Sequence, residues 1–270
     1  MKLKTITVPD LHGKDEWKLI NPDNYDKIIF LGDYVDAPYR SLSDVPYGEP
    51  YKIDDIKINS YNGKTNAEIL YNLHEVIEFK KKYLDKVILN VGNHDIPYIM
   101  RMRCPSLQKF VTCSGYRYTM ASELAVLFNE NFNQFQIAYQ LGNVVWSHAG
   151  LTQEAYDLYF KCKLNDKFDI LTEELNKEFI LNSLQLYRIS HLRGGMNEYG
   201  SITWADRREW NAKTYKLPFI QIVGHTPNEE ILYLYNDGTL SVSALDKKLI
   251  AVFTDVLSTK TKFFEYEVEI

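Results

Sequence analysis

Five short segments rich in aspartate, histidine, asparagine and glycine carry the side chains that could perform chemistry in this chain. They are PDLHG (9–13), GDYVD (32–36), GNHD (92–95), SHAG (147–150) and GHTP (224–227). Carboxylate, amide and imidazole groups together suit Mn, Fe, Zn, Ni or Co better than Ca or Cu(I). Two adjacent divalent ions are a common protein solution for hydrolysing a phosphate ester. The clusters therefore predict a site for two divalent metal ions, with Mn expected first.

Each cluster follows an apolar run that is typical of a β-strand. These runs are 3–8, 27–31, 86–91, 143–146 and 219–223, and later runs cover 240–245, 249–254 and 262–268. Helical patterns cover 66–84, 122–132, 151–160 and 169–187. Strands that alternate with helices predict an α/β fold, in which the strand ends gather the clusters at one edge. Short connections between the last strands predict antiparallel pairing.

Two stretches have the character of insertions. Residues 37–62 show weak periodicity and predict a loop. Residues 162–215 are mostly helical at first and then read RGGMNEYGSITWADRREW. We expect a single domain over 1–270 with a helical cap at about 160–215 that covers the site. The alternative is a helical pair that only packs on the sheet.

Composition narrows the possible partners. No run approaches the roughly 18 apolar residues of a membrane span, and the first residues lack a signal-peptide pattern, so we expect a cytoplasmic protein without membrane contact. The formal net charge of -5 provides no basic face and argues against an extended nucleic acid as partner. The cysteines show no metal-ligand spacing and are expected to be ordinary reduced thiols. They are Cys104, Cys113 and Cys162.

The order and wording of the clusters resemble the calcineurin-like metallophosphoesterases. Within that superfamily the chain is most similar to the branch of phosphoprotein phosphatases and symmetrical dinucleoside tetraphosphatases. GDYVD, WAD (204–206) and SALDKKLIAVF (243–253) carry the resemblance beside the other clusters. It spans roughly residues 3–255 and is poor over 37–65 and 151–200. It implies a four-layer αββα sandwich and a metal-dependent phosphoric ester hydrolase.

Chemistry and the resemblance together suggest a role for each cluster residue. Asp10 and His12 lie two residues apart in one turn and can reach the same ion. Asp33 is the candidate bridge, because a carboxylate can hold two cations. The resemblance implies one ion on Asp10, His12 and Asp33, and a second on Asp33, Asn93, His148 and His225. It also implies that a hydroxide between the ions is the nucleophile.

The resemblance implies that His94 is the general acid that protonates the leaving oxygen. Asp36 would accept the other ring N–H of His94 and keep the ring charged. An alternative for Asp36 is a turn residue that caps the following segment. Asp95 is expected to cap its turn or to support the ligands.

The chain departs from the family pattern at the phosphate-binding arginines. Ala37 follows Asp36 where those phosphatases place an arginine, and no arginine precedes GNHD. A phosphate still needs a bidentate donor, and arginine fits best. We rank Arg193 first and Arg207 second as substrate-binding residues. Further candidates are Arg40, Arg101, Arg103 and Arg208.

Three functions remain open at this point. The first is a phosphatase that acts on a phosphomonoester of a phosphoprotein, nucleotide or small metabolite. The second is a dinucleoside polyphosphate hydrolase or a phosphodiesterase. Many superfamily diesterases carry a second histidine in the last cluster, where this chain has Pro227, so the sequence favours monoester or pyrophosphate hydrolysis. The third is a metal-binding scaffold without turnover, which the complete ligand set disfavours.

Overall fold

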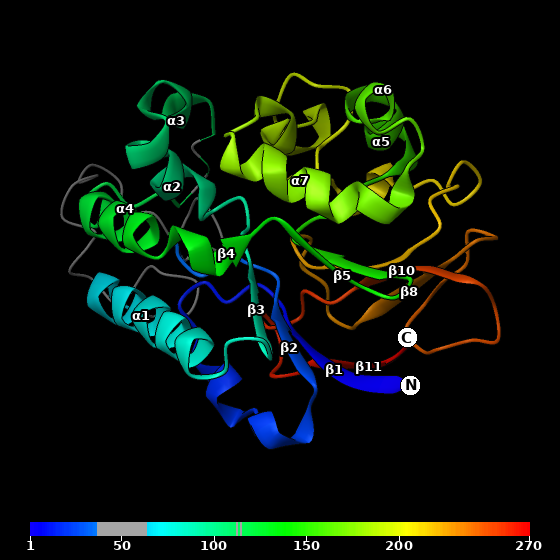
Figure 1. The fold of residues 1–270 in the computed structure, drawn as a ribbon, viewed down its shortest axis with the longest axis horizontal. Coiled ribbons are helices and arrows are strands. Elements are labelled where there is room, and N and C mark those ends of the chain that lie inside the picture. Colours follow the sequence, from blue (N-terminus) through cyan, green and yellow to red (C-terminus); the bar gives the residue numbers. More distant parts are fainter. Residues whose placement is uncertain (37–63, 112, 114) are drawn as a thin grey trace.

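The apolar runs form two mixed β-sheets that pack face to face (Figure 1). The computed structural model describes residues 1–36, 64–111, 113 and 115–270. Within these residues, the first sheet has five strands in the order β11 (Phe264–Glu269), β1 (Lys2–Val8), β2 (Lys27–Phe30), β3 (Val87–Asn90) and β4 (Phe135–Gln136). The second has six in the order β5 (Ala138–Leu141), β6 (Val144–Ser147), β7 (Ile220–Val223), β10 (Leu249–Phe253), β8 (Leu232–Tyr235) and β9 (Leu240–Ser241).

Side chains from both sheets form one buried layer between them. Ile29 and Ile88 come from the first sheet, and Trp146 and Ile222 come from the second. Each fully buried large apolar side chain contributes about 1.5–3 kcal/mol to folding. The Trp146 indole N–H donates to the Thr7 hydroxyl at 3.0 Å, so the polar atom of this residue is also paired inside the layer.

Helices cover the outer faces of the two sheets (Figure 1). The helices are α1 (Asn66–Lys82), α2 (Ile96–Arg103), α3 (Pro105–Val111), α4 (Ala121–Glu130), α5 (Gln153–Tyr159), α6 (Lys161–Leu164) and α7 (Leu171–Ile180). Short 3-10 turns are η1 (Glu16–Leu19), η2 (Pro22–Asn24), η5 (Phe132–Gln134), η6 (Phe168–Ile170), η7 (Leu184–Tyr187), η8 (His191–Arg193) and η9 (Arg207–Glu209). Helix α1 begins at a capping box in which Thr65 and Glu68 satisfy each other's backbone N–H groups. The predicted α/β sandwich is confirmed.

Parallel pairing places the cluster-bearing ends of the central strands at one edge. β1, β2 and β3 are parallel in the first sheet, and β6, β7 and β10 are parallel in the second. The antiparallel pairing expected for the last strands is found for some of them. β8 is antiparallel to β10 and β11 is antiparallel to β1, whereas β10 runs parallel to β7.

Some predicted elements differ from the structure. The run 240–245 forms only the two-residue strand β9, because Val242 and Leu245 are exposed and join no sheet. The predicted helix 169–187 is broken, since α7 ends at Ile180 and Asn182 adopts a left-handed backbone with φ 57°. The sequence did not predict α2, α3, β4, β5 or β8. The predicted loop 37–62 and Arg40 lie outside the described residues.

The segment proposed as a cap has two parts. Its helical part packs on the edge strand β5, where Asn176 accepts the N–H groups of Ile137 at 2.9 Å and Ala138 at 3.2 Å. Its irregular part, 188–209, reaches the loop after β7, where Arg193 donates to Thr226 at 2.7 Å. The single domain with a cap stays a prediction. Across the ranges described above, no helix is both long enough and apolar enough to cross a membrane.

Candidate metal centre

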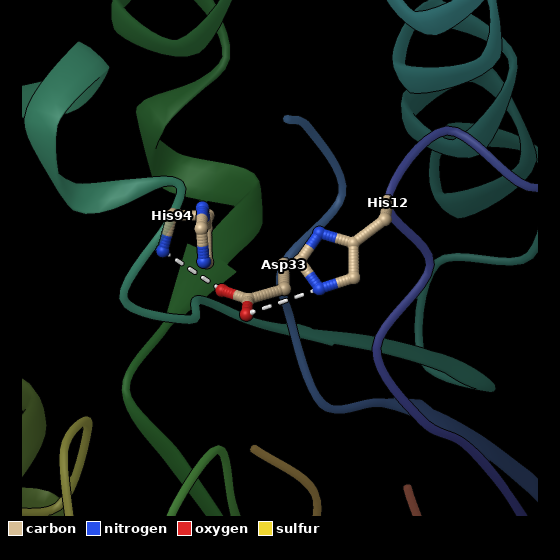
Figure 2. A group of neighbouring side chains, drawn as sticks. All are labelled: His12, Asp33 and His94. Atoms are coloured by element: carbon tan, nitrogen blue, oxygen red, sulfur yellow. Dashed lines mark hydrogen bonds and ion pairs between the residues drawn. The ribbon is translucent and has the colours of Figure 1, made fainter. Parts of the chain in front are cut away.

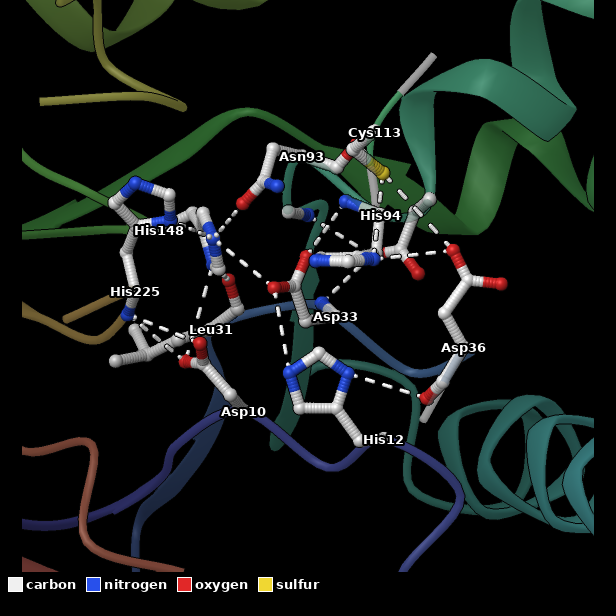
Figure 3. Close-up of polar contacts among 12 residues, drawn as sticks. Asp10, His12, Leu31, Asp33, Asp36, Asn93, His94, Cys113, His148 and His225 are labelled. Atoms are coloured by element: carbon white, nitrogen blue, oxygen red, sulfur yellow. Dashed lines mark hydrogen bonds and ion pairs between the residues drawn. The ribbon is translucent and has the colours of Figure 1, made fainter. Parts of the chain in front are cut away.

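The candidate centre lies where five strand-end turns from the two sheets converge (Figure 3). Four of its residues adopt left-handed backbone conformations, with φ of 48° at His12, 50° at Asp33, 58° at Asp36 and 67° at His225. Such conformations are costly for residues other than glycine and collect at functional sites. Glycine is required beside them at Gly92, because a Cβ atom there would collide with the Asp33 carboxylate.

One group of donor atoms surrounds Nε2 of His148. This atom lies 2.8 Å from Asn93 Oδ1, 3.2 Å from His225 Nδ1 and 3.4 Å from Asp33 Oδ2. The other ring nitrogen, Nδ1, lies 3.1 Å from the Leu31 carbonyl oxygen, which can only accept a hydrogen bond. In the neutral ring Nδ1 therefore carries the proton, and Nε2 directs a lone pair at its neighbours.

This arrangement fits a bound cation. Burial, with the charge of nearby His94, lowers the pKa of His148 well below its ordinary value, so the ring is neutral. The lone pair of its Nε2 then faces the oxygen lone pairs of Asn93 and Asp33 without a proton between them. The buried Nε2 of His225 also has no hydrogen-bond partner among the residues described. Lone pairs that converge in this way are satisfied by a metal ion.

A second group lies on the other side of Asp33. His12 Nδ1 faces the carbonyl oxygens of Val35 and Asp36, both at 3.2 Å, which leaves Nε2 directed at Asp33 Oδ2 at 3.7 Å. Burial lowers the pKa of His12 to about 3, so this ring is also neutral. Figure 2 shows Asp33 between His12 and His94. Groups with metal-ligand spacing are therefore found on both sides of one carboxylate.

Asp33, the candidate bridge, lies between the two groups of donor atoms. Its Oδ1 accepts the backbone N–H of His94 at 2.8 Å. Its Oδ2 is the atom that faces both His12 and His148. A single oxygen therefore lies between the two groups, and the second oxygen fixes the carboxylate in place.

Asp10 lies farther from the other predicted ligands. Its two oxygens accept the backbone N–H of His225 at 3.1 and 3.0 Å, and Oδ1 lies 3.9 Å from His148 Nδ1. Among the residues described, the tightest metal-capable groups contain Asp33 with His12 and His94, or with His148 and His225, but not Asp10. The structure thus connects Asp10 to the turn that carries His225.

Several carboxylates share this buried edge and raise one another's pKa. Burial and the charges of neighbouring carboxylates raise the pKa of Asp10 and Asp33 well above the ordinary value. Burial raises the pKa of Asp95 and Asp255 to about 7. A cluster of negative charges in a buried place is stabilised by cations, which agrees with the donor groups described above.

Asp95 organises the turns rather than facing an ion. It accepts the N–H groups of Gly92 and Asp33 at 2.8 Å and that of Tyr34 at 2.9 Å. These bonds tie the turn after β3 to the turn after β2. Asp255, which follows β10 as the clusters follow their strands, was not predicted; its place after an apolar run was the pattern that could have indicated it.

His94 and Asp36 form a buried pair beside Asp33. His94 Nδ1 lies 3.0 Å from Asp36 Oδ2. The other oxygen of Asp36 accepts the Tyr98 hydroxyl, whose oxygen accepts the backbone N–H of Arg117 at 2.8 Å. Burial lowers the pKa of His94 to about 4 and raises the pKa of Asp36. Because Tyr98 and Arg117 stabilise the carboxylate, we place the proton of the pair on the Nδ1 atom of His94.

A sequence profile of the calcineurin-like phosphoesterases matches residues 10–254 of the chain. The chain belongs to this family. The family assignment and the donor groups agree, since these phosphoesterases use divalent metal ions. No curated protein sequence matches the chain.

Solved structures provide further similarities at low sequence identity. A cold-active protein-tyrosine phosphatase of a psychrophilic Shewanella species is 14% identical with a TM-score of 0.48, over 97% of this chain and 75% of that one. A protein serine/threonine phosphatase from Saccharomyces cerevisiae is 13% identical with a TM-score of 0.43, over 94% and 67%. A metallophosphoesterase from Sphaerobacter thermophilus is 12% identical with a TM-score of 0.42, over 95% and 77%.

The first-ranked arginine, Arg193, contacts the loop that carries His225. Arg193 pairs with Asp206 through Nε at 2.7 Å and donates to the Thr226 hydroxyl at 2.7 Å. Burial lowers the pKa of His225, and the charges of His148 and Arg193 lower it further. Arg207 donates to Asn228 in the following loop.

The other arginine candidates point elsewhere. Arg208 pairs with Asp206 at 2.8 Å but is 63% exposed. Arg101 contacts Ser122 on the surface, and Arg103 lies over the ring of Phe132 at 3.6 Å. Among the described candidates, Arg193 is the one whose side chain donates to Thr226, the residue after His225.

Proposed function

We propose that this phosphoesterase is a dinuclear metal-dependent phosphatase that hydrolyses phosphomonoesters. The observation that carries the proposal is the position of Asp33. One of its oxygens lies between the imidazoles of His12 and His148, and its other oxygen accepts the N–H of His94, the proposed acid. The proposed substrates are phosphoproteins, nucleotides or small phosphorylated metabolites.

The proposed ligands of the two ions are those expected from the sequence. Asp10, His12 and Asp33 would hold one ion, and Asp33, Asn93, His148 and His225 would hold the other. When bound, the cations polarise the phosphoryl oxygens and lower the pKa of water so that it can attack phosphorus. Mixed oxygen and imidazole donors favour Mn in this proposal, with Fe, Zn, Ni or Co as alternatives.

His94 is the proposed general acid because one of its nitrogens is already fixed. Asp36 holds Nδ1 at 3.0 Å, so the ring presents Nε2 to a leaving oxygen. A dianionic phosphate in the adjacent site raises the pKa of His94 and so favours the charged ring. Asp36 then stabilises the imidazolium and keeps the ring in one orientation.

Arg193 is the proposed phosphate-binding residue, with Arg207 second. Thr226 and Asp206 fix the Arg193 guanidinium, and the loop that it contacts also carries His225. Fixing the planar group in advance lowers the entropy cost of binding a phosphate.

The function can be tested with a pair of esters. Protein stripped of metal is expected to hydrolyse p-nitrophenyl phosphate only after Mn is restored, and to hydrolyse bis(p-nitrophenyl) phosphate much more slowly. Faster hydrolysis of the bis-ester, or of diadenosine tetraphosphate, would favour the diesterase or dinucleoside polyphosphate alternative. Inactivity on all three substrates with Mn bound would support a scaffold without turnover.

A further inference from the structure

A cysteine lies against the proposed acid pair, on a segment that the sequence motifs do not mark. Cys113 Sγ lies 3.3 Å from His94 Nδ1 and 4.0 Å from Asp36 Oδ2 (Figure 3). The third side of this triangle is the 3.0 Å contact between His94 Nδ1 and Asp36 Oδ2. Thiol, imidazole and carboxylate thus present one donor atom each to a common centre.

The three separations match those of ligands around tetrahedral zinc. Zinc bonds of about 2.3 Å to sulfur and about 2.0–2.2 Å to nitrogen or oxygen place neighbouring ligand atoms roughly 3.3–3.6 Å apart. Each observed separation lies within about half an ångström of that range. Three protein ligands with a fourth position left for water are a common zinc arrangement.

The carboxylate of this triad is already oriented by an outer contact. Tyr98 donates its hydroxyl hydrogen to Asp36 Oδ1, and the backbone N–H of Arg117 holds the Tyr98 oxygen at 2.8 Å. These bonds leave Oδ2 directed at His94 and Cys113. Outer contacts of this kind orient the ligands of a metal and strengthen its binding.

We propose that Asp36, His94 and Cys113 form a separate, inhibitory site for a thiolate-binding cation of the Zn²⁺ class. On binding, the Cys113 S–H bond breaks, its proton leaves to solvent and a metal–sulfur bond forms. The ring proton of His94 moves from Nδ1 to Nε2, so that Nδ1 and Asp36 Oδ2 also bind the ion. One thiolate and one carboxylate neutralise the divalent charge, which suits a buried position. Mn²⁺ prefers oxygen donors and competes poorly for such a site.

The inhibitory consequence rests on the proposed function of His94. A ring whose Nδ1 binds a metal holds only one proton, and losing it would leave an anionic imidazolate. It is therefore a much weaker acid than the imidazolium that the reaction needs. Inhibition should be strongest for alkyl phosphates, whose leaving oxygen needs a proton, and weaker for p-nitrophenyl phosphate.

The site itself can be tested without any assay of activity. Co²⁺ bound to a thiolate shows a near-ultraviolet charge-transfer band that imidazole and carboxylate ligands do not produce. A chain carrying Cys104→Ser and Cys162→Ser is expected to develop this band to the intensity of one Co²⁺–thiolate bond per chain, whatever Co²⁺ the oxygen and imidazole donors also bind. Adding Cys113→Ser or Cys113→Ala should abolish it. Absence of the band in the first chain, or its persistence without Cys113, would overturn the proposal and leave Cys113 as a hydrogen-bond partner of His94.

Zinc inhibition provides the second measurement. Each variant is loaded with Mn, and its rate with added Zn²⁺ is divided by its own rate without zinc. Cys113→Ser should raise the half-inhibitory zinc concentration by at least about 10–100-fold, the loss that even an outer-shell partner produces. Cys104→Ser should leave it unchanged. If the Cys113-dependent band appears but the protein hydrolyses none of the esters, the cation site is supported and the phosphatase proposal is rejected. An unchanged zinc response in Cys113→Ser would reject the inhibitory role.

Discussion

The two sides of the candidate centre are built in different ways. On the metal side, the proposed ligands occupy turns at the ends of buried strands, and Asp95 ties two of these turns through three backbone N–H groups. On the substrate side, Arg193 ends the 3-10 turn η8 and is held by two side chains, those of Asp206 and Thr226. Its side chain is 24% exposed, whereas that of Asp33 is 2% exposed.

This difference indicates that metal binding and substrate preference can change independently of each other. Strand-end positions are fixed by the sheets, so a ligand there cannot move without disturbing the core. A side chain on an irregular segment can be replaced or repositioned at little cost to folding. We therefore expect the metal chemistry to be a property of the fold, and substrate preference to be a property of segment 188–209.

The largest expected effect is at the shared carboxylate. Asp33→Asn should weaken the binding of both ions, and turnover should fall by more than the about 10²–10⁴-fold expected for loss of a general acid. Elemental analysis after dialysis gives the metal content per chain and so checks whether both ions are lost. Asp237→Asn, which removes a surface carboxylate paired with Lys247, is the matched control. Loss of a single ion would show that Asp33 is not shared.

The next effect separates acid catalysis from metal binding. His94→Ala should keep two ions per chain and lower turnover by about 10²–10⁴-fold for esters with poor leaving groups. The loss should shrink for p-nitrophenyl phosphate, because its leaving group needs no proton. Rates for the two ester types are compared at equal metal content. An equal loss for both would assign His94 a structural role.

A smaller effect is expected on the substrate side. Arg193→Ala should weaken the use of dianionic monoesters by about 10–100-fold in kcat/KM, as expected for the loss of a charged hydrogen bond worth about 1.5–3 kcal/mol. Arg208→Ala is the matched control, because Arg208 pairs with the same Asp206 but is 63% exposed. If Arg193→Ala has wild-type kinetics, phosphate binding would be assigned to Arg207 instead.

The same contrast explains what could be predicted from the sequence. Cluster residues that follow apolar runs were predictable, because parallel strands bring their carboxyl ends to one edge, and Asp33, Asn93 and His148 lie together there. Cys113 was not predictable, since it reaches His94 from a segment without periodicity. The contact of Arg193 with Thr226 depends on how an irregular segment folds back, which no local pattern encodes.

Element type was also easier to predict than element extent. Helix α1 was predictable because its apolar period and capping box agree. The break after α7 was not, because it depends on Asn182 adopting φ 57° between two apolar stretches. Strand β8, which lies between β10 and β9, is not predicted above, although its sequence LYLY is an apolar run of the kind that favours a strand.

The smallest expected effect is a change in folding stability with pH, caused by buried carboxyl groups on the metal side. Burial raises the pKa of Asp95 and Asp255 to about 7, whereas the unfolded carboxyl titrates near 4. At pH 6.5 these two carboxyl groups of the folded, metal-free chain therefore hold protons that the unfolded chain has lost, so the stability that they contribute falls as pH rises through about 7. The loss between pH 6.5 and 8.5 is roughly 1 kcal/mol for each carboxyl group, or about 2–4 °C in Tm.

The histidines oppose this trend, so the measurement compares protein with and without Mn at each pH. Burial lowers the pKa values of His12 and His94 to about 3 and about 4. An unfolded histidine titrates at about pH 6.5, so the stability linked to these rings is partly lost at pH 6.5 and regained at pH 8.5. The rise in Tm on adding Mn to metal-free protein should be larger at pH 8.5 than at pH 6.5, because the cations stabilise the charged carboxylates and protons compete less for them at high pH. A metal-induced rise in Tm that is no larger at pH 8.5 than at 6.5 would show that the buried carboxylates do not face the ions. The buried carboxylates would then be held in place by backbone hydrogen bonds alone, as Asp95 is.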